Sequence, residues 1–134
     1  MNASYLLDTC AWLDAFSAPE QLKPSIRKLL GAQSVVHLAA ISTIEVARKE
    51  AAGQLIFGMP LGTWFERAMP EHRIKVIDLS PTIAIDATRL PQWEHRDPAD
   101  QIIVATARVH GLTILTSDQK ILRYPHVKSQ ATRK

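Results

Sequence analysis

Residues 97–118, DPADQIIVATARVHGLTILTSD, decide the fold because a helix signature is followed at once by a strand signature. Asp97 is a good N-cap residue, and Pro98 is a favoured first residue of a helix. Apolar residues then recur at helical spacing as far as Gly111, a residue type that commonly ends helices. The next run, residues 112–116, is short, apolar and β-branched, which predicts a buried strand. A helix joined to a strand by a short turn is the repeating unit of parallel α/β sheets.

The same alternation extends outward through the rest of the chain. We expect strands at residues 4–8, 34–38, 74–79 and 112–116, with helices at 11–16, 19–30, 42–50, 61–69, 81–90, 98–110 and 119–123. This order predicts an α/β fold, a three-layer α/β/α sandwich with a central parallel sheet of four or five strands in Rossmann-like topology. Residues 1–128 should form a single domain, and residues 129–134 a frayed, polar C-terminal tail.

Composition is that of a globular protein and weakly indicates the kind of partner. The 134 residues are 46% hydrophobic and 22% charged, and the net charge of +3 modestly favours a polyanionic partner. The single cysteine, Cys10, excludes an internal disulfide and a Cys-rich zinc site, and we expect it to be a small buried residue. The first residues lack the basic and apolar segments of a signal peptide, and no stretch approaches membrane-spanning length, so we expect a cytoplasmic protein.

Four acids that are far apart in the sequence should gather at one edge of the sheet. Asp8 and Asp118 end apolar strands, whereas Glu45 and Asp100 lie in the opening turns of helices. Open α/β sheets bind ligands at the carboxyl ends of their strands. Crowded carboxylates need a cation, and hard oxygen ligands select Mg²⁺ or Mn²⁺. The four acids are therefore candidate metal ligands and catalytic residues of a metal-dependent phosphodiesterase.

The chemistry of phosphodiester hydrolysis suggests a role for each acid. The anionic oxygens of the substrate repel a nucleophile, so catalysis needs charge neutralisation and an aligned water. In this hypothesis Asp8 and Asp100 ligate the principal Mg²⁺, and Glu45 positions or deprotonates the attacking water. Asp118 completes the metal shell or recruits a second ion. In-line attack by water would leave a 5′-phosphate and a 3′-hydroxyl.

Three neighbouring residues are expected to support the acids. The hydroxyls of Thr116 and Ser117, which end the last predicted strand, are candidates to orient the water. Asp97 precedes Pro98 and is expected to cap its helix rather than to bind metal.

Four segments of the chain carry these acids in a fixed order. They are Leu7-Asp8-Thr9, residues 42–49 around Glu45, residues 95–107 around Asp97-Pro98-Ala99-Asp100, and residues 115–118. Together they resemble the PIN-domain family over nearly the whole chain, and most closely its VapC-like toxins. The segment around Asp100 is the most specific of the four.

The resemblance implies a PIN-like fold and a Mg²⁺- or Mn²⁺-dependent endoribonuclease, with the four acids in its metal pocket. It also implies the toxin component of a type II toxin-antitoxin system, which inhibits translation. An RNA substrate, a homodimer and a cognate antitoxin that covers the pocket are implied as well. Cys10 and Gln101 depart from the family, because relatives often carry His and Arg at these positions. Both departures leave every carboxylate in place and bear on substrate preference.

Each acid also has a purely structural interpretation. Asp8 stands where it can cap the following helix, and Asp100 stands where it can complete a capping box. Glu45 can pair with Lys49 one helical turn later, and Asp118 suits a turn.

Two other functions remain open from the sequence. A flavodoxin-like phospho-acceptor domain would use Asp8 for Mg²⁺, Asp78 as the acceptor and Lys120 as the counter-charge. A catalytically silent binding module would use its acids as helix caps.

Overall fold

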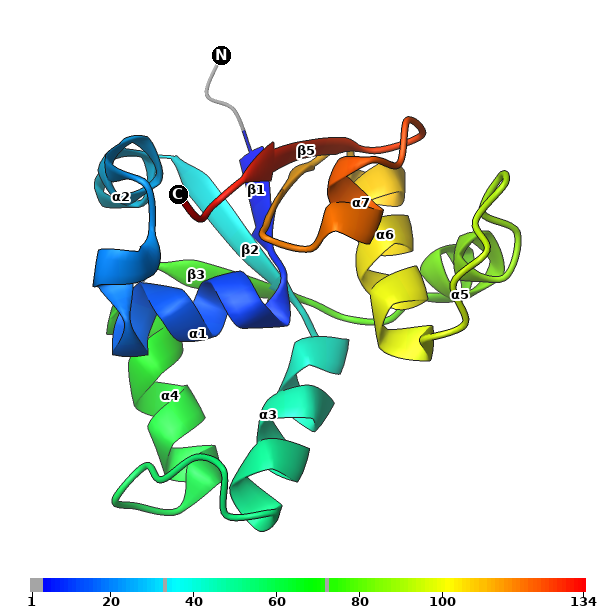
Figure 1. The fold of residues 1–134 in the computed structure, drawn as a ribbon. Helices are drawn as coiled ribbons and strands as arrows, with labels where there is room; N and C mark the ends of the chain where they lie inside the picture. Colours follow the sequence, from blue (N-terminus) through cyan, green and yellow to red (C-terminus); the bar gives the residue numbers. More distant parts are fainter. Residues whose placement is uncertain (1–3, 33, 72) are drawn as a thin grey trace.

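Five parallel strands form the centre of the molecule (Figure 1). The computed structural model describes residues 4–32, 34–71 and 73–134. The strands lie in the order β3-β2-β1-β4-β5, so the first strand is central, and Leu7 lies opposite both Leu38 and Leu115. Their bounds are β1 Ser4–Leu7, β2 Val35–Ala39, β3 Ile74–Ile77, β4 Thr113–Thr116 and β5 Lys128–Ala131. The predicted parallel sheet is confirmed, with five strands.

Helices occupy most of the chain between the strands. Asp8, Ser80, Asp97 and Asp118 cap four of the helices with their side chains, and Gly111 ends one of these in the left-handed conformation, with φ of 66°. Among the described helices, none is long and apolar enough to cross a membrane. Their bounds are α1 Thr9–Ser17, α2 Pro24–Gly31, α3 Ile41–Ala51, α4 Leu61–Glu71, α5 Pro81–Ala87, α6 Pro98–His110 and α7 Gln119–Leu122, with a 3₁₀ turn at Pro19–Gln21.

Both faces of the sheet are buried, because successive strand residues enter two different cores. Leu7 packs in one core with side chains of α1 and α2, including Trp12. Leu6 packs in the other core with side chains of α6 and α7, including Ile103. A strand whose neighbouring residues are both fully buried requires a covering layer on each side. The three layers predicted from the sequence are therefore present.

The C-terminal segment corrects one prediction. Residues 129–134 are not a frayed tail, because Lys128–Ala131 form the edge strand β5 in register with β4. Thr132 is fully buried, and Arg133 forms a 2.8 Å ion pair with Asp14 of α1. An edge strand is held by main-chain hydrogen bonds and buries little of its polar side chains, so hydrophobic patterning does not reveal it.

The helix predicted over residues 19–30 is also corrected. A 3₁₀ turn ends at Gln21, Lys23 is extended with ψ of 144°, and α2 begins at Pro24. Proline disfavours the helical conformation of the residue before it and has no N–H for a helical hydrogen bond, so it starts a new helix here.

Candidate active site at the carboxyl end of the sheet

Asp8 lies at the centre of the carboxyl edge, in contact with the strand beside its own. Because β1 and β4 run parallel, the residue after Leu7 comes next to the residue after Leu115. Asp8 Oδ2 accepts a hydrogen bond from the Thr116 hydroxyl, and Oδ1 accepts one from Ala11 N at 2.8 Å. The Asp8 side chain is thus buried and fixed in orientation by two donors.

Thr116 joins Asp8 to Asp118. Its hydroxyl donates to Asp8 and accepts the backbone N–H of Asp118 at 2.9 Å. Asp118 Oδ1 in turn accepts the backbone N–H of Lys120 at 2.8 Å and caps α7. The predicted convergence of the two strand-ending acids is therefore present, with one fully buried hydroxyl between them.

Glu45 reaches the same edge from α3. Its carboxylate is hydrogen-bonded by the Thr9 hydroxyl, which also lies 2.9 Å from the hydroxyl oxygen of Ser42. A threonine hydroxyl has one proton, so donation to Glu45 leaves Ser42 as the donor to Thr9. Because Thr9 follows Asp8 directly, this chain of hydrogen bonds connects α3 to the end of β1.

The acids of α6 have different partners. Asp97 accepts the backbone N–H of Ala99 at 2.9 Å and caps the helix, as predicted. Asp100, in the first turn, receives the Lys120 ammonium at 3.0 Å, and this ammonium also lies 3.8 Å from Asp118. Asp100 and Asp118 therefore share one cation already present in the protein.

Ser117 lies apart from these contacts. It is half-buried and lines a separate small hollow with Arg133 and Lys134. The hydroxyl of Thr116, by contrast, is occupied between Asp8 and Asp118. Its observed contacts are to the Asp8 carboxylate and the Asp118 backbone N–H.

Burial and mutual repulsion raise the pKa values of Asp8, Glu45 and Asp100. Burial raises the pKa of Asp8 to about 6, with further increases from Asp118 and Asp100, although the Thr116 hydrogen bond opposes them. Burial likewise raises the pKa of Glu45, and repulsion by Asp100 adds to it. The pKa of Asp100 is raised mainly by burial and lowered by its bond to Lys120. Carboxyl groups held in this way favour a bound cation.

The structural interpretations account for part of this arrangement. Asp8, Asp97 and Asp118 do cap helices. Glu45 and Asp100 do not, because Glu45 lies within α3 and turns to Thr9, and Asp100 turns to Lys120. Helix capping alone leaves these two partly buried acids unexplained. In a phospho-acceptor domain Lys120 would be the counter-charge of Asp78. In this structure Lys120 instead pairs with Asp100 and Asp118.

Sequence reasoning missed Thr9 and Ser42 and gave Lys120 a different role. The parallel pairing of β1 with β2 and β4 places Thr9 at the site, but the contact with Ser42 depends on how α3 packs. Cys10 was expected to be buried and is instead exposed, because it faces outward on the first turn of α1. Gln101 donates to the backbone carbonyl of His95 at 3.2 Å and thereby ties α6 to the preceding loop.

The side chains at the site are of the kind that binds a divalent cation, but they are not arranged as a complete coordination shell. They are carboxylates, the ligands that Mg²⁺ and Mn²⁺ prefer. Within the described part of the chain, no three acidic, His or Cys side chains lie close enough together to enclose an ion. The Lys120 ammonium lies between Asp100 and Asp118 and supplies the positive charge that such a cation would supply. Mg²⁺ keeps several of its own waters, so it needs few protein ligands.

Comparison with known proteins agrees with the fold. A model of the PIN domain family matches residues 5–127. Ribonuclease VapC22 of Mycobacterium tuberculosis is 28% identical over 108 residues, which cover 81% of this chain and 82% of that protein. The crystal structure of VapBC2 from Rickettsia felis bound to a promoter DNA fragment superposes with a TM-score of 0.70 at 15% identity, over 96% of this chain and 98% of that one. FitAcB from Neisseria gonorrhoeae superposes with a TM-score of 0.63 at 24% identity, over 93% and 95% of the two chains. Because the family model spans nearly the whole chain, this protein belongs to the PIN domain family.

Proposed function

We propose that this protein is a Mg²⁺- or Mn²⁺-dependent endoribonuclease and the toxin component of a toxin-antitoxin pair that inhibits translation. The observation that carries the proposal is the joining of Asp8 to Asp118 through Thr116, with Asp100 and Glu45 brought to the same edge. The PIN domain match and the similarity to a ribonuclease support the activity.

Asp8, Asp100 and Asp118 are the proposed metal ligands, and Glu45 is the fourth acid of the pocket. The divalent cation, when bound, would neutralise the phosphate charge and stabilise the departing oxygen. The shared contact of Asp100 and Asp118 with Lys120 supports their assignment, since both carboxylates already face one positive charge. Lys120 would have to leave this position, and its exposed side chain is free to turn toward solvent.

Glu45 is the proposed general base. Its raised pKa brings the carboxylate closer to the range in which it can accept a proton from an attacking water. The hydrogen bond from Thr9 holds the carboxylate in one orientation while its other oxygen remains available. Hydrolysis would leave a 5′-phosphate and a 3′-hydroxyl, and Thr116 would keep Asp8 and Asp118 aligned throughout.

The proposal includes a protein inhibitor and self-association. One solved structure with this fold is a toxin-antitoxin complex from Klebsiella pneumoniae, and two others are VapBC structures with DNA, which supports a cognate antitoxin as partner. Exposed apolar side chains such as Ile56 and Ile44 offer contact surface for partner chains. We propose a homodimer in which the antitoxin covers the acid pocket.

Sequencing of the RNA ends produced by the purified protein, with and without Mg²⁺, tests the activity, the metal requirement and the substrate together. We expect new 5′-phosphate ends only when Mg²⁺ is present. Asp8→Asn should abolish them, whereas Glu20→Gln, which neutralises an exposed acid on a 3₁₀ turn, should not. Equal cleavage by the wild type and Asp8→Asn would contradict the proposal.

A further inference from the structure

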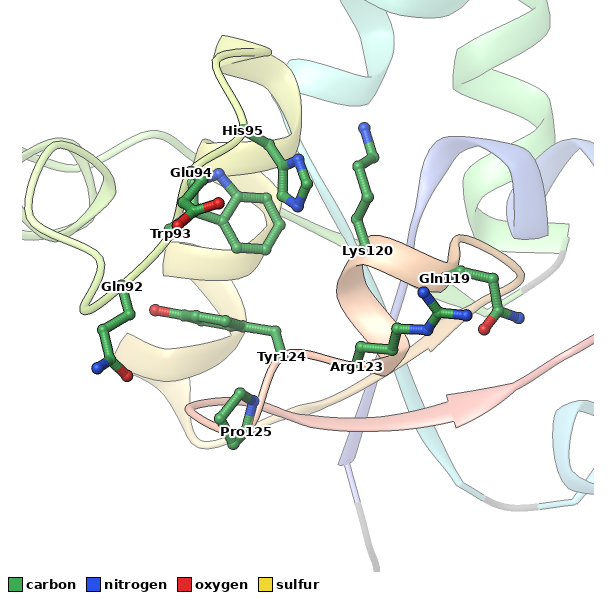
Figure 2. Close-up of a pocket in the computed structure, with 9 residues that line it drawn as sticks. All are labelled: Gln92, Trp93, Glu94, His95, Gln119, Lys120, Arg123, Tyr124 and Pro125. Carbon is green, nitrogen blue, oxygen red and sulfur yellow. The ribbon is translucent and has the colours of Figure 1, made fainter.

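A cavity of about 320 Å³ adjoins the acid pocket (Figure 2). One wall is the loop of residues 92–95 that precedes α6, and the other is α7 with the residues that follow it. Lys120 belongs to both sites, because it lines the cavity and its ammonium contacts Asp100. Whatever occupies this cavity therefore lies next to the acids.

The loop wall of the cavity is aromatic and held in place. The Trp93 ring meets His95 edge to face at 4.8 Å and Tyr124 at 4.9 Å between ring centroids, both at 78°. Tyr124 is buried, and its hydroxyl donates to the backbone carbonyl of Pro91 at 2.6 Å. Trp93 is only half-buried and His95 is exposed, so these two rings keep surface for a ligand. A flat partner would meet a wall that needs little rearrangement.

The opposite wall is cationic. Lys120 and Arg123 stand three residues apart, at the end of α7, and both side chains are exposed. Figure 2 shows them across the cavity from Trp93 and Glu94, whose carboxylate is the one negative group in the lining. The cavity is thus polarised, with positive charge on the helix side and aromatic rings on the loop side.

We propose that this cavity is a subsite for one nucleobase of single-stranded RNA. The base lies against Trp93 and His95, and its neighbouring phosphate contacts Arg123 and Lys120. Aromatic rings beside cations bind unpaired nucleotides because every base has a π-face and every link a negative charge. The volume is at the low end of the range of about 300–1,000 Å³ for small-ligand sites, which suits one base rather than a folded partner.

This inference rests on the proposed function and adds a specificity element to it. Because the cavity adjoins the acids, a base held here fixes which phosphodiester reaches the acid pocket. The subsite would therefore determine the nucleotide preference beside the cleavage position. It requires an unpaired base, so cleavage should favour loops and single strands over duplexes.

Binding measured in a cleavage-inactive background separates the subsite from catalysis. A fluorescently labelled, single-stranded RNA of mixed sequence is titrated with the full-length Asp8→Asn protein and with Asp8→Asn carrying His95→Ala or Arg123→Gln. We expect each added substitution to weaken binding roughly tenfold. For Arg123→Gln the slope of log affinity against log salt should also become shallower by about 0.7, and for His95→Ala it should not change. Arg67→Gln, an exposed arginine on α4, serves as the charge-matched control and should bind like its parent.

A second readout guards against loss of folding. Trp93→Phe keeps a ring in the wall, and its thermal unfolding verifies the fold. RNA should quench tryptophan fluorescence in the parent and much less in Trp93→Phe, where Trp12 and Trp64 remain.

Unchanged RNA affinity in both His95→Ala and Arg123→Gln would overturn the subsite even if the wild type cleaves RNA. Weakened antitoxin binding with unchanged RNA binding would assign the cavity to a protein partner and would also overturn it. Absence of cleavage by the wild type, with these binding losses present, would refute the proposed function and leave the subsite standing.

Discussion

The ammonium of Lys120 lies 3.0 Å from Asp100 Oδ2 and occupies the side of the acid pocket that faces α7. Asp118 lies 3.8 Å from the same ammonium. The pocket therefore already neutralises part of its negative charge with a residue of its own. A divalent cation that binds these carboxylates must compete with that side chain.

Removal of Lys120 should strengthen metal binding. Lys120→Gln removes the competing charge, and an exposed ion pair contributes about 0.2–1 kcal/mol, so the Kd for Mn²⁺ should fall up to about fivefold. Isothermal titration without RNA measures this directly. Lys128→Gln, which changes an exposed lysine on the edge strand, is the matched control. Weaker Mn²⁺ binding by Lys120→Gln would show that the lysine supports the site rather than competing for it.

Thr116 should stabilise both the fold and the site. Thr116→Val keeps the shape of the side chain but removes the hydrogen-bond partner of Asp8 Oδ2, which is buried, and of the Asp118 N–H, which is partly buried. We expect a loss of about 2–3 kcal/mol in the free energy of unfolding, measured with urea. Thr88→Val removes an exposed hydroxyl bonded to a helical carbonyl and should change stability far less. Equal stability of the two variants would contradict the bridging role of Thr116.

The pKa of Asp8 should make metal-free stability depend on pH. Its folded value of about 6 lies above the ordinary value of 3.8, so the neutral form is favoured in the folded protein. The resulting stabilisation is complete below about pH 4 and is lost as the pH rises through 6. Asp8→Asn cannot ionise. Its stability relative to wild type should therefore rise between pH 4 and pH 7, by on the order of 3 kcal/mol at most.

Denaturant titrations of both proteins at pH 4, 5, 6 and 7 in EDTA measure this difference. Mg²⁺ added at pH 7 should stabilise the wild type more than Asp8→Asn, because it binds the ionised carboxylate in the folded state. A stability difference that stays constant with pH would exclude a raised pKa at Asp8.

Thr9 should affect the pKa of Glu45, the proposed general base, rather than the affinity for metal. Its hydrogen bond to Glu45 lowers the pKa of that carboxyl against the larger effect of burial. Thr9→Val removes the bond, so the pKa of Glu45 should rise and the acidic limb of the pH–rate profile should move to higher pH. Mn²⁺ affinity should change little. The control is Thr43→Val, on the same helix as Glu45. A profile that does not move would mean that Glu45 is not the titrating base.

Hydrophobic periodicity predicted the parts of the fold that bury apolar side chains. The runs that became β1 and β4 end in fully buried residues, Leu6-Leu7 and Ile114-Leu115-Thr116, so their pattern was strong. The strand β5 has alternating exposed and half-buried residues, three of them polar, and its existence depends on pairing with β4 rather than on its own sequence. The break at Pro24 was readable from proline chemistry, but the helical periodicity on either side obscured it.

The acids of the site were predictable because each stands at the end of a strand or in the first turns of a helix. The topology then brings Asp8 and Asp118 together through neighbouring parallel strands. The hydroxyls that orient the acids were harder to foresee. Thr9 and Ser42 are 33 positions apart, and their contact depends on the packing of α3. Lys120 is separated from Asp100 by a whole strand and meets it only in the folded chain.

The central claim is that four remote acids form one divalent-metal site. Anomalous diffraction from a crystal of the protein grown with Mn²⁺ tests it most directly. We predict a strong anomalous peak coordinated by Asp8 and Asp100, with Asp118 and Glu45 in direct or water-mediated contact and Lys120 turned away. A peak elsewhere on the molecule, or no peak at saturating Mn²⁺ with Lys120 still bound to Asp100, would contradict the account.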